Sequence, residues 1–161
     1  MEFRLFRESD LSLYLRWVNQ KEIWEVDNAG PFEIRTSDSF SDQWRRIVAW
    51  RRSWMMELEG RAIGYIGFVS DVEDGLTNEF FIVIGEVSEW GKGHGVVAMA
   101  WLFQTAKQLG LNKLMGQVLG NNERALAFYK NLGFVIVGEQ EPRFTRNGKT
   151  YATLLIEKEL G

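Results

Sequence analysis

The stretch Trp90-Gly91-Lys92-Gly93-His94-Gly95 decides how this chain is interpreted, because it lies between a predicted strand and a predicted helix. Glycine lets a backbone approach a ligand closely, and the first amides of a helix have no partner inside the helix. Such a loop favours an anion such as a pyrophosphate, and Lys92 adds a positive charge. The same glycines could instead form only a tight turn.

Spacing separates this loop from two other phosphate-binding loops. The dinucleotide fingerprint requires G-x-G-x-x-G, and the P-loop requires Gly-Lys followed by Ser or Thr. Gly91, Gly93 and Gly95 satisfy neither pattern. The loop therefore remains a candidate phosphate-binding loop of another kind.

The segments around the loop predict a mixed sheet with helices packed on it. We expect strands over residues 3–5, 54–58, 61–69, 79–85, 114–119, 134–137 and 151–156. We expect helices over 11–18 after a Ser9 cap, over 40–51, over 95–109 before Gly110, and from Asn121-Asn122 to Gly133. Two-residue turns are expected at Glu59-Gly60 and Asn147-Gly148, an acidic loop over 71–75, and residues 20–38 as irregular.

Composition indicates one packed domain over residues 1–161. Hydrophobic residues make up 45% of the chain, which includes 7 Trp and 11 Phe. The net charge of -3 and the pI near 5.3 argue against a protein that binds nucleic acid through phosphates. No run of apolar residues is long enough to span a membrane, and the N-terminus lacks a signal-like apolar region. We therefore expect a cytoplasmic protein without nucleic-acid or membrane partners.

The scarcity of reactive side chains narrows the chemistry further. The chain has no Cys and a single histidine, His94. Disulfides, zinc-thiolate sites and an acyl-cysteine intermediate are thereby excluded, and a zinc enzyme or a Ser-His-Asp hydrolase is disfavoured. We expect no metal.

Two motifs resemble those of the GNAT N-acetyltransferase superfamily and follow one another in the same order along the chain. The loop resembles its pyrophosphate-binding motif Q/R-x-x-G-x-G/A, with Trp90 in the Gln/Arg position, as in the ribosomal-protein N-terminal acetyltransferase branch. Downstream, Asn122, Ala125 and Tyr129 match N-x-x-A-x-x-x-Y. Leu15 to Asn19 resembles the Trp-x-Asn helix ending of the ribosomal-protein and amino-sugar branches.

The resemblance implies roles for these residues toward acetyl-CoA. Asn122 would contact the pantetheine arm, and Tyr129 would be the general acid for the departing thiolate. Backbone amides near Ile84 and Gly85 would bind the acetyl carbonyl where two strands splay apart. The pyrophosphate would lie on the loop formed by Trp90, Gly91, Lys92, Gly93, His94 and Gly95, with His94 contributing its backbone. Alternatively, Tyr129 is a core aromatic of an amphipathic helix, and residues 79–85 are a buried strand without this role.

A general base is needed because an amine with a pKa near ~10 is mostly protonated at neutral pH. Glu79 lies eleven positions before Trp90 and resembles the catalytic glutamate of the histone-acetyltransferase branch. Two alternatives stay open: Glu79 marks an exposed strand end, or water removes the proton.

The acceptor in this family enters between the first helices and the last hairpin. The candidate walls are Trp24, Glu25, Asp27, Phe32 and residues 142–149. Carboxylates there suit a cationic amine, but Glu25 and Asp27 could equally be solvated loop charges.

The resemblance implies an α/β (α+β) fold, with a mixed, mostly antiparallel sheet of six to seven strands and about four helices. It implies direct acetyl transfer from acetyl-CoA to a protein N-terminal amine or a small amine, by a monomer or homodimer. The alternative is an acyl-CoA-binding module or sensor without turnover. A nucleotide-phosphate binder ranks last.

Overall fold

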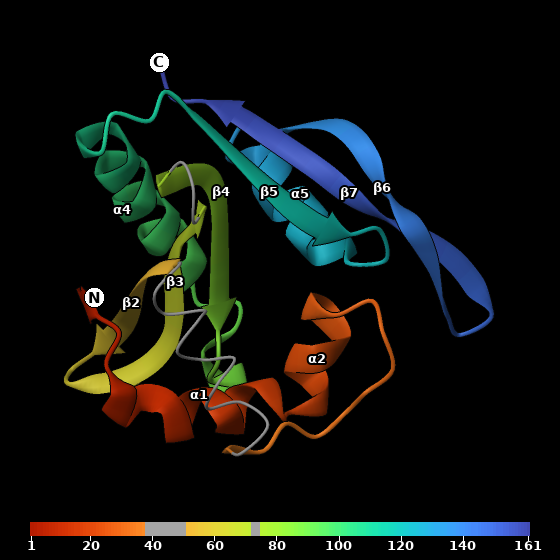
Figure 1. Cartoon of the computed structure of the whole chain (residues 1–161), viewed down its shortest axis with the longest axis horizontal. Coiled ribbons are helices and arrows are strands. Elements are labelled where there is room, and N and C mark those ends of the chain that lie inside the picture. Colours follow the sequence, from red (N-terminus) through yellow and green to blue (C-terminus); the bar gives the residue numbers. More distant parts are fainter. Residues whose placement is uncertain (38–50, 72–74) are drawn as a thin grey trace.

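A seven-stranded sheet organises the computed structural model, which describes residues 1–37, 51–71 and 75–161 (Figure 1). The strands are β1 (Glu2–Leu5), β2 (Arg51–Leu58), β3 (Arg61–Asp71), β4 (Gly75–Ile84), β5 (Lys113–Leu119), β6 (Val135–Arg146) and β7 (Lys149–Glu159). The helices are α1 (Leu11–Val18), α2 (Lys21–Asp27), α4 (His94–Gln108) and α5 (Glu123–Asn131), with short 3-10 helices η1 (Glu8–Asp10) and η2 (Val87–Glu89). The helix expected over 40–51 lies outside the described residues except for Arg51, which opens β2, and so do residues 72–74 of the expected acidic loop.

The strands lie in the order β1-β2-β3-β4-β5-β7-β6. Every neighbouring pair is antiparallel except β4 and β5, which are parallel. The structure therefore confirms the expected mixed, mostly antiparallel sheet, and the described part of the chain carries four α-helices. None of those helices is long and apolar enough to cross a membrane.

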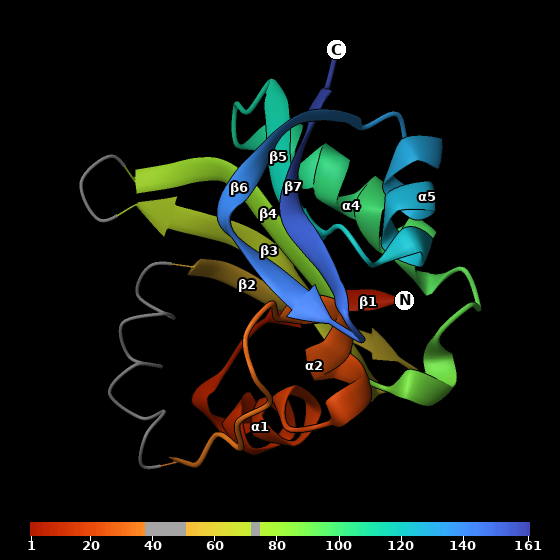
Figure 2. The same ribbon diagram turned by 90° about the vertical axis from the view of Figure 1, so that its right-hand side faces the viewer.

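Both expected two-residue turns form. Glu59 and Gly60 have φ angles of 52° and 75°, and Asn147 and Gly148 have φ angles of 51° and 74°. Positive φ at both central residues is the type I′ geometry, whose twist matches that of the flanking strands. The second turn places the tip of the β6–β7 hairpin beside α2 (Figure 2).

Alternation along the strands divides the core between the two faces of the sheet. Phe68 of β3 lies in the larger core, which α4 and α5 cover. Tyr65, three residues earlier, packs on the opposite face against Trp17 of α1. Because helices cover both faces of the sheet, a ligand can reach the strand backbone only where neighbouring strands separate.

Two local expectations were wrong. Residues 20–38 are not irregular throughout, because Lys21–Asp27 form α2, a helix too short to show a clear period in the sequence; its Ile23 is 1% exposed. Ser9 does not cap α1. Asp10 directly precedes α1, but its carboxylate makes no bond to the amides of α1 and accepts instead from the Arg7 amide at 2.8 Å and from Arg4.

The parallel pair β4–β5 opens a gap in the sheet. In the described residues these strands pair at one position, Glu79 opposite Met115, whereas β5 and β7 pair from Lys113 to Leu119. Beyond that position β4 and β5 diverge (Figure 1). The edge of β4 that follows Glu79 therefore faces a gap rather than a neighbouring strand.

Candidate active site

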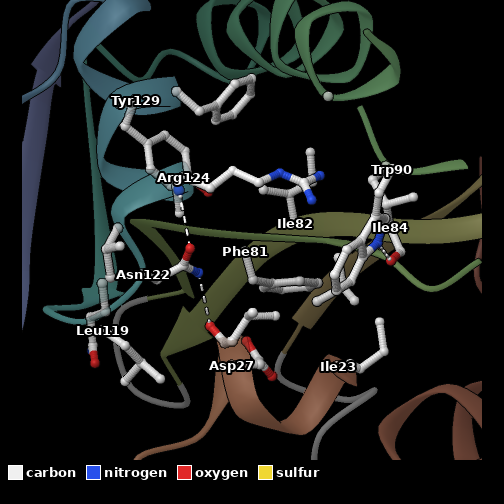
Figure 3. Close-up of a pocket in the computed structure, with 18 of the residues that line it drawn as sticks. Ile23, Asp27, Phe81, Ile82, Ile84, Trp90, Leu119, Asn122, Arg124 and Tyr129 are labelled. Atoms are coloured by element: carbon white, nitrogen blue, oxygen red, sulfur yellow. Dashed lines mark hydrogen bonds between the residues drawn. The ribbon is translucent and has the colours of Figure 1, made fainter. Parts of the chain in front are cut away.

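A cleft of about 750 Å³ occupies the gap between β4 and β5 (Figure 3). It brings together sequence-predicted site residues from five elements: Asp27, Glu79, Ile84, Trp90, Gly91, Gly93, His94, Gly95, Asn122 and Tyr129. Gly85, Lys92 and Phe32 are not part of its described lining. Trp24 and Glu25 line a second hollow, of about 520 Å³, which shares Val26, Asn122 and Arg124 with the cleft.

The glycine loop ends in an exposed helix N-terminus at the cleft. Gly91 and Gly93 have φ angles of 78° and 84°, which disfavour any residue with a Cβ, and Gly93 is the N-cap of α4. No side chain of the described residues caps this first turn. A Cβ on Gly95 would lie 3.2 Å from the Phe128 ring, so this glycine permits close packing of α5. The Val96 amide donates to the Gly93 carbonyl at 3.0 Å, so the amides of His94 and Gly95 are the ones left for an anion among the described residues.

Glu89 holds the glycine loop through contacts with its side chains, and the sequence analysis did not predict this role. Glu89 is 8% exposed. Its carboxylate accepts hydrogen bonds from Arg61 at 2.7 Å and from Lys92 at 3.2 Å, and it lies 3.1 Å from His94 Nε2. Hydrogen bonds from Lys92, Arg61 and His94, in that order, lower the pKa of Glu89 to about 2. Lys92 and His94 therefore turn toward Glu89 and fix the loop, and the expected contribution of Lys92 is a structural one as much as a charge for the ligand.

Trp90 fastens the loop to the sheet. Its Nε1 donates to the carbonyl oxygen of Ile84 at 2.7 Å. The guanidinium of Arg124, from the start of α5, lies 4.9 Å from the centre of the Trp90 ring and projects across the cleft (Figure 3). Arg124 is a second residue that the sequence reasoning missed, although it stands inside the Asn122 motif.

The two amides expected to bind the acetyl carbonyl have different orientations. The amide of Gly85 donates to Ile63 of β3 at 2.8 Å, so it is not available to a ligand, and that expectation was wrong. A Cβ on Gly85 would lie 2.1 Å from the Trp17 ring, which explains the glycine by packing. Since successive residues of a strand alternate in direction, the amide of Ile84 points away from β3, into the gap.

Tyr129 lies on the α5 wall of the cleft and is partly buried. Its ring packs against Phe80, Phe128 and Phe134 at centroid distances of 5.7, 5.1 and 5.4 Å. Burial raises the pKa of the Tyr129 hydroxyl well above its ordinary value, and the negative charge of Asp27 raises it further. The hydroxyl is therefore protonated at neutral pH, as a proton donor must be.

Glu79 lies at the closed end of the gap. It alternates with Phe80, so its side chain lies on the same face as Phe81, the face that carries Tyr65 and α1. Gln117 of β5 donates to Glu79 Oε1 at 3.0 Å. A carboxylate and a tyrosine hydroxyl thus reach one cleft from opposite faces of β4.

Asn122 joins the start of α5 to α2. Its side-chain oxygen accepts from the Ala125 amide at 3.1 Å, as an N-cap does, and its Nδ2 donates to the Val26 carbonyl at 3.3 Å (Figure 3). A contact of Asn122 with a pantetheine arm remains a prediction, and its cap role shows why this position requires a short amide.

The residues expected to line the acceptor side do not all lie in the cleft. Asp27 lines the cleft, whereas Glu25 forms an exposed pair with Lys21 at 3.8 Å, which fits the solvated alternative for Glu25. The Trp24 ring packs edge-on against the Phe32 ring, with their centres 5.7 Å apart. Over the described residues, no group of three or more His, Asp or Glu side chains is placed to hold a metal ion.

Comparison with known proteins identifies relatives of this chain. A family model for the acetyltransferase (GNAT) domain matches residues 1–135. An uncharacterized protein of Methanocaldococcus jannaschii is 26% identical over 133 residues, 81% of this chain, but the chain spans only 27% of that relative's length. The solved spermidine N-acetyltransferase of Vibrio cholerae, in complex with CoA and spermine, has a TM-score of 0.80 at 19% identity, over 99% of this chain and 95% of that one. The ribosomal-protein-alanine N-acetyltransferase of Brucella melitensis has a TM-score of 0.69 at 19% identity, over 99% of each chain.

Proposed function

Because this chain belongs to the GNAT family of acetyltransferases, we propose that it transfers the acetyl group of acetyl-CoA to a primary amine by direct attack. The activity would belong to one domain over residues 1–161 in the cytoplasm. The observation that carries the proposal is the gap between β4 and β5, which joins an uncapped helix N-terminus to a protonated tyrosine.

The cleft fits coenzyme A by the chemistry of its walls. The first turn of α4, entered through Gly91 and Gly93, offers free amides to the pyrophosphate. The edge of β4 that faces the gap offers the Ile84 amide to a carbonyl oxygen. Asn122 lines the same cleft from the start of α5. When bound, acetyl-CoA supplies an acetyl group activated as a thioester.

Tyr129 is the proton donor of the proposed reaction. The amine nitrogen bonds to the acetyl carbon, the carbon–sulfur bond breaks, and the Tyr129 hydroxyl gives its proton to the sulfur. The Tyr129 hydroxyl keeps its proton at neutral pH, so the proton is present when the sulfur leaves. No residue needs to carry the acetyl group, which agrees with a chain that has no Cys.

Glu79 is the proposed acceptor of the amine proton, directly or through water. It lies in the cleft lining on the acceptor face of β4, and its hydrogen bond from Gln117 fixes one carboxylate oxygen. Asp27, whose charge acts on Tyr129, adds a second carboxylate that attracts a cationic amine to the cleft.

The acceptor of the proposed reaction is a protein N-terminal amine or a small amine. The solved structures of similar shape include a spermidine N-acetyltransferase and a ribosomal-protein-alanine N-acetyltransferase, so both kinds of acceptor are compatible with this fold.

Turnover with a panel of amines tests the proposal. The protein would be mixed with acetyl-CoA and, separately, with putrescine, spermidine, glucosamine and a hexapeptide with a free N-terminus, while the thiol of free coenzyme A is measured. We expect amine-dependent thiol release matched by acetylated amine. Tight binding of acetyl-CoA without release for any amine would contradict an enzyme and favour an acyl-CoA sensor.

A further inference from the structure

A single side chain at the tip of the last hairpin holds the acceptor wall together. Arg146 ends β6 and donates through its two terminal nitrogens to the carbonyls of Glu25 and Asn28, the latter at 2.7 Å. Its guanidinium also lies 4.8 Å from the centre of the Trp24 ring and 5.5 Å from that of Phe144. The hairpin is thereby fastened to the end of α2.

The fastening is reinforced from α5. Asn122 donates to the carbonyl of Val26, so three carbonyls at the end of α2 are held by two side chains from distant elements. Carbonyls at a helix C-terminus lack partners within the helix and attract a cation, which explains why an arginine fits there. We call these contacts of Arg146 and Asn122 the α2 bridge.

Two hollows adjoin at the α2 bridge. Val26, Asn122 and Arg124 line both the main cleft and the hollow of about 520 Å³ beyond it, whereas Arg146 and Asn147 line only the outer hollow. A chain that ran from the outer hollow into the main cleft would have to part the hydrogen bonds of the bridge.

The volume of the main cleft also limits the size of the acceptor. Its volume of about 750 Å³ is that of a site for one small molecule, for which roughly 300–1,000 Å³ is typical. The proposed coenzyme arm takes up much of this space. What remains, beside Asp27 and Glu79, suits a small cationic group.

From these observations we propose that the acceptor is a small cationic amine that binds within the main cleft, and that the α2 bridge excludes extended peptides. The proposal rests on the proposed acetyl transfer and chooses between its two acceptors. Arg146 is the specificity-determining residue, because it closes the path that a peptide would follow, and Asp27 and Glu79 provide the charge that the amine meets.

Binding of two conjugates of coenzyme A tests the size limit without turnover. In one conjugate the coenzyme sulfur is joined through an acetyl spacer to putrescine, and in the other to the N-terminus of a neutral hexapeptide. Titration calorimetry would give both dissociation constants for the wild-type protein. We expect the putrescine conjugate to bind at least about tenfold more tightly.

Substitution of Arg146 tests the cause of that preference. We expect Arg146→Ala to bring the two dissociation constants within about threefold, chiefly by tighter binding of the peptide conjugate, and Arg146→Lys to give an intermediate ratio, because one ammonium cannot reach both carbonyls in the same way. Arg52→Ala is the matched control, since Arg52 is an exposed arginine of β2 outside both hollows, and it should leave the ratio unchanged. If Arg146→Ala does not fold, the ratio of the lysine variant decides.

Three results would overturn the inference. They are equal or tighter binding of the peptide conjugate to the wild-type protein, a folded Arg146→Ala variant with the wild-type ratio, and a putrescine conjugate that binds no better than coenzyme A. A failure of the proposed function is seen separately, as the absence of amine-dependent thiol release.

Discussion

The two walls of the cleft are held by contacts of very different reach along the chain. On the wall proposed for the coenzyme, Glu89 binds Lys92 and His94, three and five residues away, and its most distant partner, Arg61, is 28 residues away. On the acceptor wall, Arg146 binds the carbonyls of Glu25 and Asn28, 121 and 118 residues away. The coenzyme wall is therefore shaped mostly by one short segment, whereas the acceptor wall exists only after the hairpin, α2 and α5 have docked.

This difference has a consequence for how each wall responds to change. We expect a substitution in the loop from residue 89 to residue 95 to affect only the wall proposed for the coenzyme. A substitution in the α2 bridge acts across three elements and changes what can enter. The family model matches residues 1–135, so Arg146 and the tip of the hairpin lie beyond the matched residues.

The largest effect is expected at Tyr129, where the two walls meet. Tyr129→Phe keeps the ring packing against Phe80 but removes the proton donor, so we expect kcat to fall by about 100-fold, within the usual range for a general acid. The dissociation constant of acetyl-CoA should change little. Because the pKa of Tyr129 is raised, the wild-type rate should show no loss from tyrosine ionisation up to its ordinary pKa near ~10.

Steady-state kinetics and calorimetry on the same samples check this expectation. Tyr151→Phe is the control, since Tyr151 packs against Phe144 in the hairpin and does not line the cleft. Equal rates for wild-type and Tyr129→Phe protein would remove Tyr129 from the chemistry and leave it as a core aromatic.

Substitution of Gly93 should disturb the wall proposed for the coenzyme without changing the acceptor side. Alanine at a φ of 84° costs about 1–2 kcal/mol, so Gly93→Ala should lose that much stability or distort the loop and weaken acetyl-CoA binding by up to about tenfold. Denaturant unfolding and calorimetry separate the two results. Gly138→Ala, where the Cβ meets Leu155 at an ordinary 3.6 Å, should change neither quantity by more than a small fraction of this.

Asn122 sharpens the comparison because it serves both walls. Asn122→Ala loses the N-cap of α5 and the link to Val26, and we expect a loss of about 1 kcal/mol, or roughly 2–4 °C in Tm for a chain of this size. Asn122→Asp keeps the cap but cannot donate to Val26. Its stability should lie closer to the wild type than that of the alanine variant.

Thermal unfolding of the three proteins gives the ranking. If the aspartate variant were as unstable as the alanine variant, the long-range link to α2 would outweigh the local cap.

The smallest effect on turnover is expected for Glu89→Gln, because Glu89 acts on the fold through Arg61, Lys92 and His94 and its charge contributes to stability. The pKa of Glu89 is depressed from 4.5 to about 2, so its carboxylate stabilises the fold fully above pH 4.5. That contribution is lost as the pH falls through about 2. The stability difference between wild-type and variant protein should therefore be constant above pH 4.5 and shrink below it.

Unfolding midpoints measured over this range of pH check the sign. A difference that grew as the pH fell from 4.5 toward 2 would contradict a role for the charged carboxylate.

Local patterns were enough to predict most of the fold and one wall of the site. The two type I′ turns, the glycine loop at the start of α4 and the cap at Asn122 each depend on residues within a few positions of one another. The mixed sheet was predicted from the strands that these turns and loops connect. Such features are visible in a single sequence because their physical causes are local.

The remaining features could not be predicted because their causes are tertiary. Nothing near Arg146 in the sequence signals the end of α2, and α2 itself has one buried residue, Ile23, rather than a periodic apolar face. The Gly85 amide looked free because its partner, Ile63, lies on another strand. Glu89 could have been suspected as an acidic residue directly before a loop with Lys92 and His94.

Thermal stabilisation by ligands tests the central claim, a coenzyme A cleft between β4 and β5, most directly. Acetyl-CoA, coenzyme A and ATP would be compared side by side on the wild-type protein, where a ligand at 100 times its dissociation constant adds about 2.7 kcal/mol of stability. We expect Tm to rise by several degrees with both coenzyme A ligands and to stay unchanged with ATP. No rise with acetyl-CoA or coenzyme A at high concentration, or an equal rise with ATP, would contradict the account and reduce the loop at Gly91 and Gly93 to a turn or a general phosphate site.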